Sequence, residues 1–267
     1  MERAGIMTLT TDFGGDGPYV AAMKGIVLGL APGTPLVDVS HAIGPQNVLE
    51  GAFVLAAVVD AFPAGTVHLA VVDPGVGTDR RLIAVAMADQ WFVLPDNGLI
   101  SGVALGRTPS GIWEVANPSL RRSTVSATFH GRDVLAPAAV HLLKGGDPAE
   151  LGPARRSFVR LANFEPRADS LGFLAEVIFR DAFGNLITNL SVHHLASAGS
   201  PGWCIEVSGE RICGLCRTYG DHPPGSLVAL AGSAGWVEIA VVNGDAGRYL
   251  SAGPGTTVRF HRSGPRG

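Results

Sequence analysis

The chain has 267 residues, of which 46% are hydrophobic and 16% charged, with a formal net charge of −3. This balance excludes a disordered chain and a coiled coil, and without a basic run there is no electrostatic case for nucleic acid binding. The apolar runs are too short for a bilayer and the three cysteines form no paired framework, so we expect a cytoplasmic protein with no secretion signal and no membrane partner.

The first half of the sequence alternates strand and helix patterns. β-branched and apolar runs predict strands, and apolar residues spaced three or four apart predict helices. The predicted strands are residues 6–11, 34–41, 66–72, 81–88 and 90–94, and the predicted helices are residues 19–31, 47–62, 98–106 and 134–146. This alternation predicts an α/β domain with a doubly wound, mostly parallel sheet.

The helical pattern stops after Gly146. Short strands separated by glycine turns are predicted at residues 171–179, 184–190, 203–209, 211–219, 226–232, 236–242 and 256–262. Such close spacing is typical of a small barrel or sandwich. We therefore predict the class α/β + all-β, with an α/β domain at residues 1–150, a linker at 151–170 and a C-terminal β-barrel domain at 171–267.

One stretch, VVDPGVGTDRR at 71–81, places Asp73 at a strand end and Arg80 beyond a glycine-rich turn. Ligands of open α/β sheets collect where strands end, so an acid and a guanidinium at this place suggest a site. A surface ion pair is the equally plausible alternative. Arg81 adjoins Arg80, and spacing alone does not say which of the two guanidinium groups faces a ligand.

Three more strand ends carry polar side chains. Asp12 follows the first strand and suits a ribose, because a carboxylate can accept hydrogen bonds from two neighbouring hydroxyls. Aspartates are also common in turns, which is the simpler alternative. The G-x-G-x-x-G fingerprint is missing there, so nicotinamide chemistry has no support. Asp96 and Asn97 are most simply turn residues, whereas His130 precedes a predicted helix, which favours a neutral imidazole.

The second half contains two polar clusters. Asp181, Phe183 and Asn185 lie within five residues, and an aromatic face beside an amide can hold a purine, although on spacing alone a β-turn with a core phenylalanine is the preferred interpretation. The segment with Ser233 and Glu238 has the same ambiguity. Cys213-x-x-Cys216 invites a zinc interpretation with Cys204 and His222, but only one close pair exists, so we expect no metal.

Seven blocks occur in one order: TTDFG with YVAAMKG, DVSHAIGPQNV, VVDPGVGTDRR, PDNGL, TFHGRDVLAPAA, DAFGNLITN and GSAGWVEIAVVNG. Together, from Thr8 to Gly244, they closely resemble the S-adenosyl-L-methionine (SAM) hydroxide adenosyltransferase family, also called SAM hydrolases, which are related to the fluorinating and chlorinating adenosyltransferases. The resemblance implies hydrolysis of SAM to adenosine and L-methionine by attack of water on ribose C5′. It further implies the two-domain fold, no cofactor, and a homotrimer with SAM bound between subunits.

The resemblance also implies roles for individual residues. The catalytic set falls on Asp73, Arg80 and His130, and the ribose carboxylate falls on Asp12, with Phe129 beside the ligand. Methionine and adenine contacts map to Asp181, Phe183, Asn185 and Ser233, and Glu238 is added to the substrate-binding set. Ala234 departs from the pattern, because halogenating relatives carry an arginine there.

Water fits this chemistry, because the sulfonium leaves as a neutral thioether and needs no general acid. An arginine weakens a neighbouring carboxylate as a base, so we interpret Asp73 as a positioner of water. One alternative is a halide-dependent adenosyltransferase, which the acid at Asp73 disfavours because it repels anions. Two others are a SAM- or adenosine-binding module without turnover and a metal-dependent hydrolase.

Overall fold

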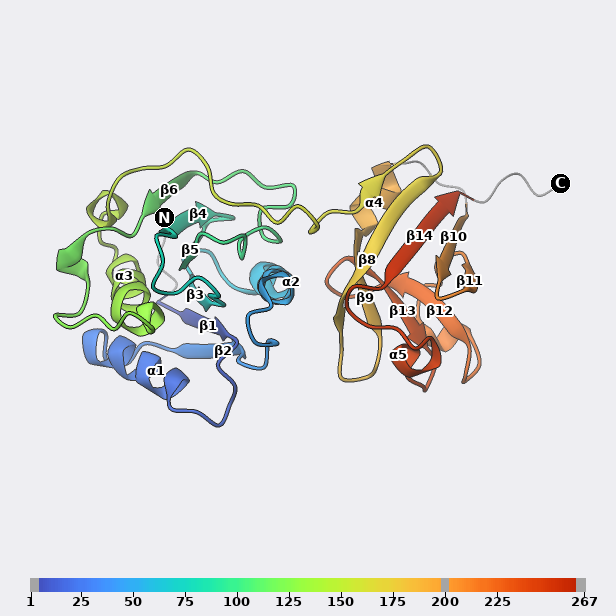
Figure 1. Cartoon of the computed structure of the whole chain (residues 1–267), viewed down its shortest axis with the longest axis horizontal. Helices are drawn as coiled ribbons and strands as arrows, with labels where there is room; N and C mark the ends of the chain where they lie inside the picture. The colour runs from blue at the N-terminus through green and yellow to red at the C-terminus, as the bar shows by residue number, and fades with distance from the viewer. Residues whose placement is uncertain (1–4, 198–201, 263–267) are drawn as a thin grey trace. The chain divides into compact units, whose positions relative to one another are not determined.

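The computed structural model describes residues 5–197 and 202–262, which form two compact units, Met1–Leu161 and Ala162–Gly267 (Figure 1). The predicted linker, 151–170, is divided between these units, because its residues up to Leu161 belong to the first and the others to the second.

The first unit is built on a six-stranded sheet. Its order is β2 (Leu36–Ser40), β1 (Met7–Thr11), β3 (Val67–Val71), β5 (Gln90–Pro95), β4 (Leu82–Met87) and β6 (Gly111–Glu114). The first four of these strands run parallel to one another, and β4 and β6 are antiparallel to their neighbours. A two-residue turn, Ala88–Asp89, joins β4 to β5, and so short a connection permits only antiparallel pairing.

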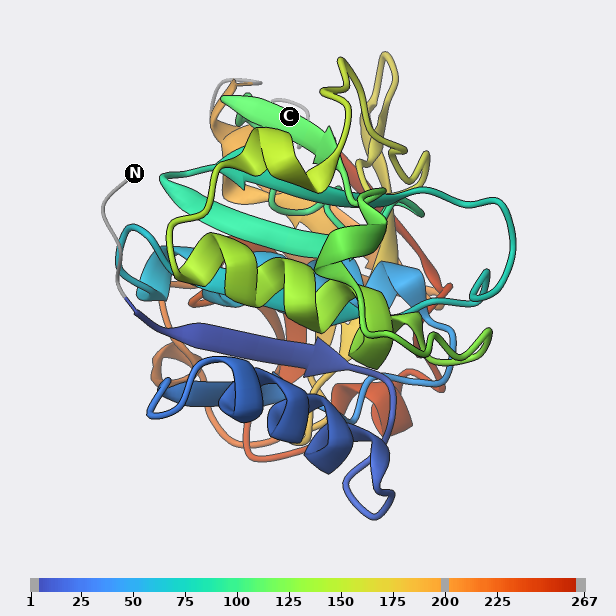
Figure 2. The same ribbon diagram turned by 90° about the vertical axis from the view of Figure 1, so that its left-hand side faces the viewer.

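Helices cover both faces of this sheet. Helices α1 (Tyr19–Leu30) and α3 (Ala136–Leu143) lie in front of it in Figure 2, and their apolar side chains share a core with β1 and β3. Helix α2 (Val48–Val58) packs on the other face, where Leu55 joins a second core with Val72 and Phe92. Strands β1, β3 and β4 are buried along their whole length, which explains their continuous apolar sequences.

Three sequence expectations for the first unit need correction. The helix predicted at 98–106 is wrong: this segment is a succession of turns, since its three glycines oppose a helix. The helix predicted at 47–62 ends in a 3₁₀ turn, η1 (Val59–Ala61). The helix predicted at 134–146 begins within a π-helical turn, η3 (Gly131–Leu135). Strand β6 and the 3₁₀ turns η2 (Pro118–Leu120) and η4 (Pro148–Leu151) were not predicted.

The second unit is an antiparallel, nearly closed barrel. Its strands follow the order β11 (Glu210–Cys213), β10 (Trp203–Val207), β14 (Thr257–Arg262), β8 (Gly172–Arg180), β9 (Leu186–Ser191), β13 (Trp236–Val241) and β12 (Leu227–Ala231), and β7 (Arg167–Ala168) pairs with β8. A bridge between Cys216 and Leu230 brings the segment after β11 against β12. The inward side chains of these strands form one core, which includes Ile205, Val237 and Phe260. The predicted fold class is therefore confirmed.

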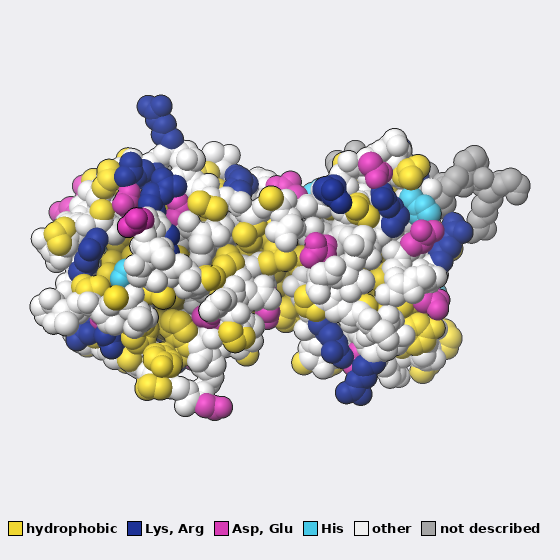
Figure 3. All heavy atoms as spheres, viewed as in Figure 1, with side chains coloured by type: hydrophobic (Ala, Val, Ile, Leu, Met, Phe, Trp, Pro, Cys, Tyr) yellow, Lys and Arg dark blue, Asp and Glu magenta, His cyan; other side chains and the backbone are white. Residues whose placement is uncertain are grey.

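The expectation that the second half lacks helices is wrong in detail. Two short helices, α4 (Val192–Ser197) and α5 (Ala246–Tyr249), and a 3₁₀ turn, η5 (Tyr219–Asp221), occur there. The strand predicted at 211–219 ends at Cys213. Basic and acidic side chains are interspersed over the face shown in Figure 3. Among the described residues, no helix combines the length and the apolar character that crossing a bilayer requires.

Candidate active site

A pocket of about 340 Å³ opens in the first unit, where β1 and β3 end. Asp12 follows β1 directly, Asp73 comes two residues after β3, and His130 precedes the π-helical turn that leads into α3. The lining is completed by Phe13, Tyr19, Pro45, Gln46, Val71, Val76, Thr128, Phe129 and Gly131. Segments far apart in the sequence meet here because parallel strands present their carboxyl ends at one edge of the sheet.

Asp73 and Arg80 form a two-pronged ion pair. Arg80 Nε lies 2.6 Å from Oδ1 and 2.8 Å from Oδ2 of Asp73, and Nη2 also donates to Oδ2. The side chains are only 5% and 10% exposed, so the pair is fixed and not a mobile surface contact. The turn between Asp73 and Arg80 requires glycine at position 77. Gly77 has a φ of +81°, and a Cβ atom there would lie only 2.8 Å from the Ala127 carbonyl oxygen.

His130 completes a chain of three polar side chains. Its Nδ1 lies 3.2 Å from Arg80 Nη2. Burial lowers the pKa of His130, and the positive charge of Arg80 lowers it further. The neutral imidazole predicted from the nearby helix terminus is instead favoured in the structure by burial and by the charge of Arg80.

The second arginine of the motif faces elsewhere. Arg81 Nη2 lies 2.5 Å from Oδ2 of Asp96, whose other oxygen accepts a hydrogen bond from Val159 N at 2.7 Å. Asn97 Nδ2 donates to the Val72 carbonyl at 2.8 Å. The turn containing Asp96 and Asn97 therefore ties loops together, as the simpler sequence interpretation had it.

Aromatic rings and one carboxylate form the rest of the pocket. The ring of Phe129 packs edge-on against Phe13 and Tyr19, with centroid distances of 5.7 and 5.6 Å. Asp12 Oδ2 accepts from the backbone N–H of Gln46 at 2.7 Å. Tyr19 and Gln46 were not singled out from the sequence, although both lie inside the blocks YVAAMKG and DVSHAIGPQNV.

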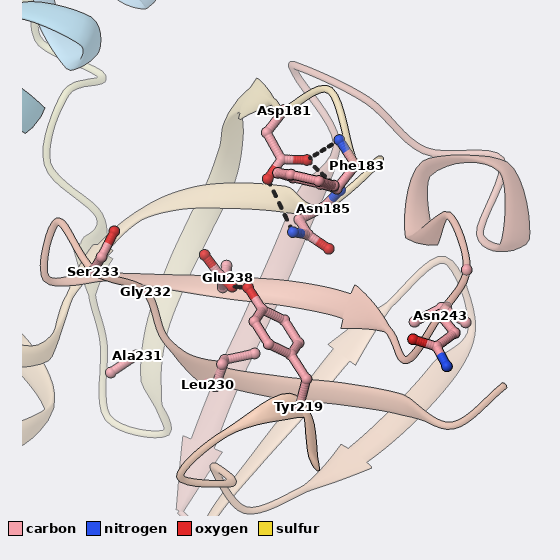
Figure 4. A pocket seen from close by; sticks show the side chains of 12 residues that line it. Asp181, Phe183, Asn185, Tyr219, Leu230, Ala231, Gly232, Ser233, Glu238 and Asn243 are labelled. Atoms are coloured by element: carbon pink, nitrogen blue, oxygen red, sulfur yellow. Dashed lines mark hydrogen bonds between the residues drawn. The ribbon is translucent and has the colours of Figure 1, made fainter. Parts of the chain in front are cut away.

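A second pocket, of about 830 Å³, lies in the barrel unit (Figure 4). Asp181 holds one side of it, because Oδ1 accepts from the backbone N–H groups of Phe183 and Asn185 at 2.9 Å, and Oδ2 accepts from Asn185 Nδ2 at 2.9 Å. This network leaves the ring of Phe183 80% exposed beside the opening. A large exposed aromatic face of this kind can stack on a planar ligand.

The far wall of this pocket contains a carboxyl–phenol pair. The Tyr219 hydroxyl donates to Glu238 Oε1. Burial raises the pKa of Glu238, and the charge of Asp181 adds to that rise. Ser233 lines the same pocket, and the described lining includes no lysine, arginine or histidine. The pocket therefore favours cationic groups. Tyr219 was not predicted as a pocket residue, because the sequence pattern predicts it as the last residue of a strand at 211–219.

The sequence-predicted residues thus fall into two sets. Asp12, Asp73, Phe129 and His130 line the first pocket, with Arg80 bonded to Asp73, and Asp181, Phe183, Asn185, Ser233 and Glu238 line the second. The first pocket combines a fixed carboxylate with a neutral imidazole. Such a pair can orient a water molecule, since one group accepts and the other donates.

Comparisons with known proteins identify the family of this chain. Residues 7–152 match the SAM hydroxide adenosyltransferase N-terminal domain, and residues 175–259 match the C-terminal domain. Proteins named (R)-S-adenosyl-L-methionine hydrolase from Salinispora arenicola and Thermus thermophilus are 40% and 41% identical, over 95% and 94% of this chain and 96% and 97% of theirs.

Structural similarity covers the same extent. A crystal structure from Thermotoga maritima, with 34% sequence identity, superposes with a TM-score of 0.87 over 96% of this chain and 100% of that one. Proteins named fluorinase match at 26% to 30% identity. The chain belongs to the SAM hydroxide adenosyltransferase family.

Proposed function

We propose that this enzyme hydrolyses SAM to adenosine and L-methionine. The observation that carries the proposal is the chain of contacts from Asp73 through Arg80 to His130 at the edge of a pocket. It holds an acceptor and a donor in fixed positions, which is what a reaction limited by the alignment of water requires. The hydrolases named above, which match nearly the whole chain, support the same conclusion.

In the proposed mechanism, the oxygen of a water molecule attacks ribose C5′ while the C5′–S bond breaks and methionine leaves as a neutral thioether. Asp73 accepts a hydrogen bond from the water, and the Nε2–H of neutral His130 donates to its oxygen. The attacking oxygen becomes a protonated alcohol, which is a strong acid. Asp73 can therefore take its proton after the C–O bond has formed.

The remaining residues would hold the substrate. We propose that Asp12 accepts hydrogen bonds from the ribose hydroxyls and that Phe129 packs beside the ligand. In the barrel unit, Asp181, Phe183, Asn185, Ser233 and Glu238 would bind the adenine and methionine groups, and its acidic lining suits the ammonium and sulfonium charges of SAM. No cofactor is needed, because the leaving group is already activated.

We also propose that the active assembly is a homotrimer in which each SAM binds between two subunits. Each SAM would bind to the first-unit pocket of one subunit and to the barrel pocket of a neighbouring subunit. Light scattering coupled to size-exclusion chromatography measures the mass directly. A monomer with full turnover would contradict this part of the proposal and leave the reaction itself untouched.

The names of the relatives specify an (R) centre. The prefix L already defines the methionine α-carbon, so (R) describes the sulfonium sulfur. We propose the same preference for this chain. Purified sulfonium epimers, assayed separately, would show faster adenosine release from the (R) form, and equal rates would contradict the preference.

The reaction is tested by incubation with SAM in ¹⁸O-labelled water, with and without chloride, followed by mass spectrometry. Hydrolysis at C5′ predicts adenosine with the label in its 5′-hydroxyl in both buffers, and retained turnover when a chelator is added. A chlorinated nucleoside would favour the halide alternative. Adenosine binding without methionine release would favour a non-catalytic module.

A further inference from the structure

Two cysteines face each other across the β10–β11 hairpin in the barrel unit. Cys204 on β10 is the direct partner of Cys213 on β11. A two-residue turn, Ser208–Gly209, closes the hairpin, and both residues have positive φ, which fixes the register. The partner of Cys213 in the fold is therefore Cys204, and not Cys216 as the Cys213-x-x-Cys216 spacing in the sequence suggests.

The ladder pattern defines the type of this pair. Gly214 N donates to the Trp203 carbonyl at 2.7 Å, so Trp203 and Gly214 form a hydrogen-bonded pair. Pairs alternate along an antiparallel ladder, and Cys204–Cys213 is therefore a non-hydrogen-bonded pair, with Cα atoms about 4.5 Å apart. Disulfides span Cα separations of about 4.4–6.8 Å, so the two sulfurs can bond without unfolding the hairpin.

Both thiols belong to the outer face of the barrel. Trp203, Ile205 and Ile212 point into the core, and the alternation of side chains places Cys204 and Cys213 on the opposite face. Cys213 is exposed, whereas Cys204 is only 1% exposed. Arg211 Nε donates a hydrogen bond to Cys204 Sγ, so a guanidinium lies directly beside this sulfur.

We propose that Cys204 and Cys213 form a redox-modification site that reacts with hydrogen peroxide. The Cys213 thiolate attacks a peroxide oxygen, the O–O bond breaks, and the product is a sulfenic acid at Cys213 with release of hydroxide. The Cys204 thiolate, held beside Arg211, then attacks the sulfenic sulfur. The S–O bond breaks, a second hydroxide leaves, and the S–S bond forms. The two thiol protons and two hydroxides make two waters.

The fold also makes this site reversible by a dithiol. Cys213 is exposed, so a disulfide formed there is accessible to a reducing dithiol. Exposed disulfides have higher reduction potentials than buried structural ones and are reduced more easily. Cys216 is excluded from this chemistry by its environment: burial raises the pKa of its thiol, and its backbone is bridged to β12.

The test uses the full-length chain treated with hydrogen peroxide, then alkylated and digested without reduction for mass spectrometry. We expect a peptide linking Cys204 to Cys213, a fall from three alkylatable thiols to one, and full recovery with dithiothreitol. Cys216→Ser is the matched control and keeps the link. Cys204→Ser loses it and accumulates a dimedone-reactive sulfenic acid at Cys213.

A second variant separates chemistry from simple proximity. Arg211→Gln removes the guanidinium beside Cys204 and leaves the hairpin turn in place, so the sulfenic acid at Cys213 should persist longer before the disulfide forms. Circular dichroism verifies that each variant is folded. A link between Cys213 and Cys216, or over-oxidation of Cys213 without any link in the unmodified sequence, would overturn the proposal. SAM turnover does not enter this test, so its outcome is independent of the proposed function.

Discussion

Nη2 of Arg80 lies 3.2 Å from Nδ1 of His130. A guanidinium offers only donors, so this hydrogen bond forms only when Nδ1 is unprotonated. The ring proton of the neutral imidazole is then on Nε2. Arg80 thus holds the carboxylate of Asp73 and selects the tautomer of His130 at the same time.

Substitution of Asp73 tests the acceptor. Asp73→Asn removes the charge that Arg80 binds and replaces one acceptor oxygen by a donor, so water loses its position. We expect kcat to fall by about 10²- to 10⁴-fold, measured by chromatography of adenosine. Asp96→Asn is the matched control, because it changes the acid that Arg81 binds; it should lower thermal stability and leave kcat of the folded enzyme close to wild type. Full turnover in Asp73→Asn would refute its role.

The adjacent arginines offer a second matched pair. Arg80→Lys keeps the charge but cannot bond Asp73 through two nitrogens and reach His130 as well. We expect a loss in kcat of at least about tenfold, which corresponds to one charge-assisted hydrogen bond. Arg81→Lys should have little effect on kcat, since Arg81 binds Asp96. Equal losses in both variants would show that the two arginines are not separated in function.

The pH dependence of turnover reports on His130. Its pKa is lowered by burial and by Arg80, so the neutral ring persists below the ordinary value of 6.5. Activity that needs neutral His130 should therefore have an acid limb whose midpoint lies below pH 6.5. In an NMR titration, Arg80→Gln should raise the pKa of His130, because a positive neighbour is lost. An acid limb centred above pH 6.5 in the wild type would contradict this.

Stability at acid pH depends on a different histidine. His68 is fully buried, with Thr8 Oγ1 at 2.8 Å and Gln90 Oε1 at 2.7 Å, and burial lowers its pKa from 6.5 to about 4. The unfolded chain therefore takes up a proton at higher pH than the folded one. The stabilisation is complete above pH 6.5 and is lost as pH falls towards 4, by about 3 kcal/mol. Urea unfolding at several pH values measures this slope.

Two variants sharpen the stability measurement. His68→Gln removes the titrating group and should flatten the slope between pH 6.5 and 4, although it lowers stability at neutral pH. His193→Gln, at an exposed position, should preserve the slope. An unchanged slope in His68→Gln would assign the acid sensitivity to other groups.

Substitution of Tyr219 tests whether its hydrogen bond to Glu238 in the second pocket contributes to substrate binding. Tyr219→Phe removes the hydrogen bond that opposes the rise in the pKa of Glu238, so the carboxyl becomes protonated at higher pH and attracts a cationic substrate less. We expect KM for SAM to rise by about tenfold, the value of a hydrogen bond to a charged group, with a smaller change in kcat. Tyr249→Phe, an exposed tyrosine of the same unit, is the control. Identical KM values would exclude Tyr219 from substrate binding.

The sequence determined the local features, because periodicity and turn residues depend on neighbours along the chain. The alternation of strands and helices up to Leu143, the short strands after Gly172 and the position of Asp73 at a strand end all follow from such patterns. The errors have the same origin. The segment 98–106 is apolar enough for a helix, but it is buried as turns in the core beside α2.

Only the tertiary structure decided which side chains meet. Arg80 and Arg81 are equivalent by spacing, yet one binds Asp73 and the other binds Asp96. The neutral state of His130 depends on burial and on a charge fifty positions away in the chain. The pairing of Cys204 with Cys213 depends on strand register. None of these relations is written in the local sequence, because each is created by contacts that form only when the sheet or the barrel closes.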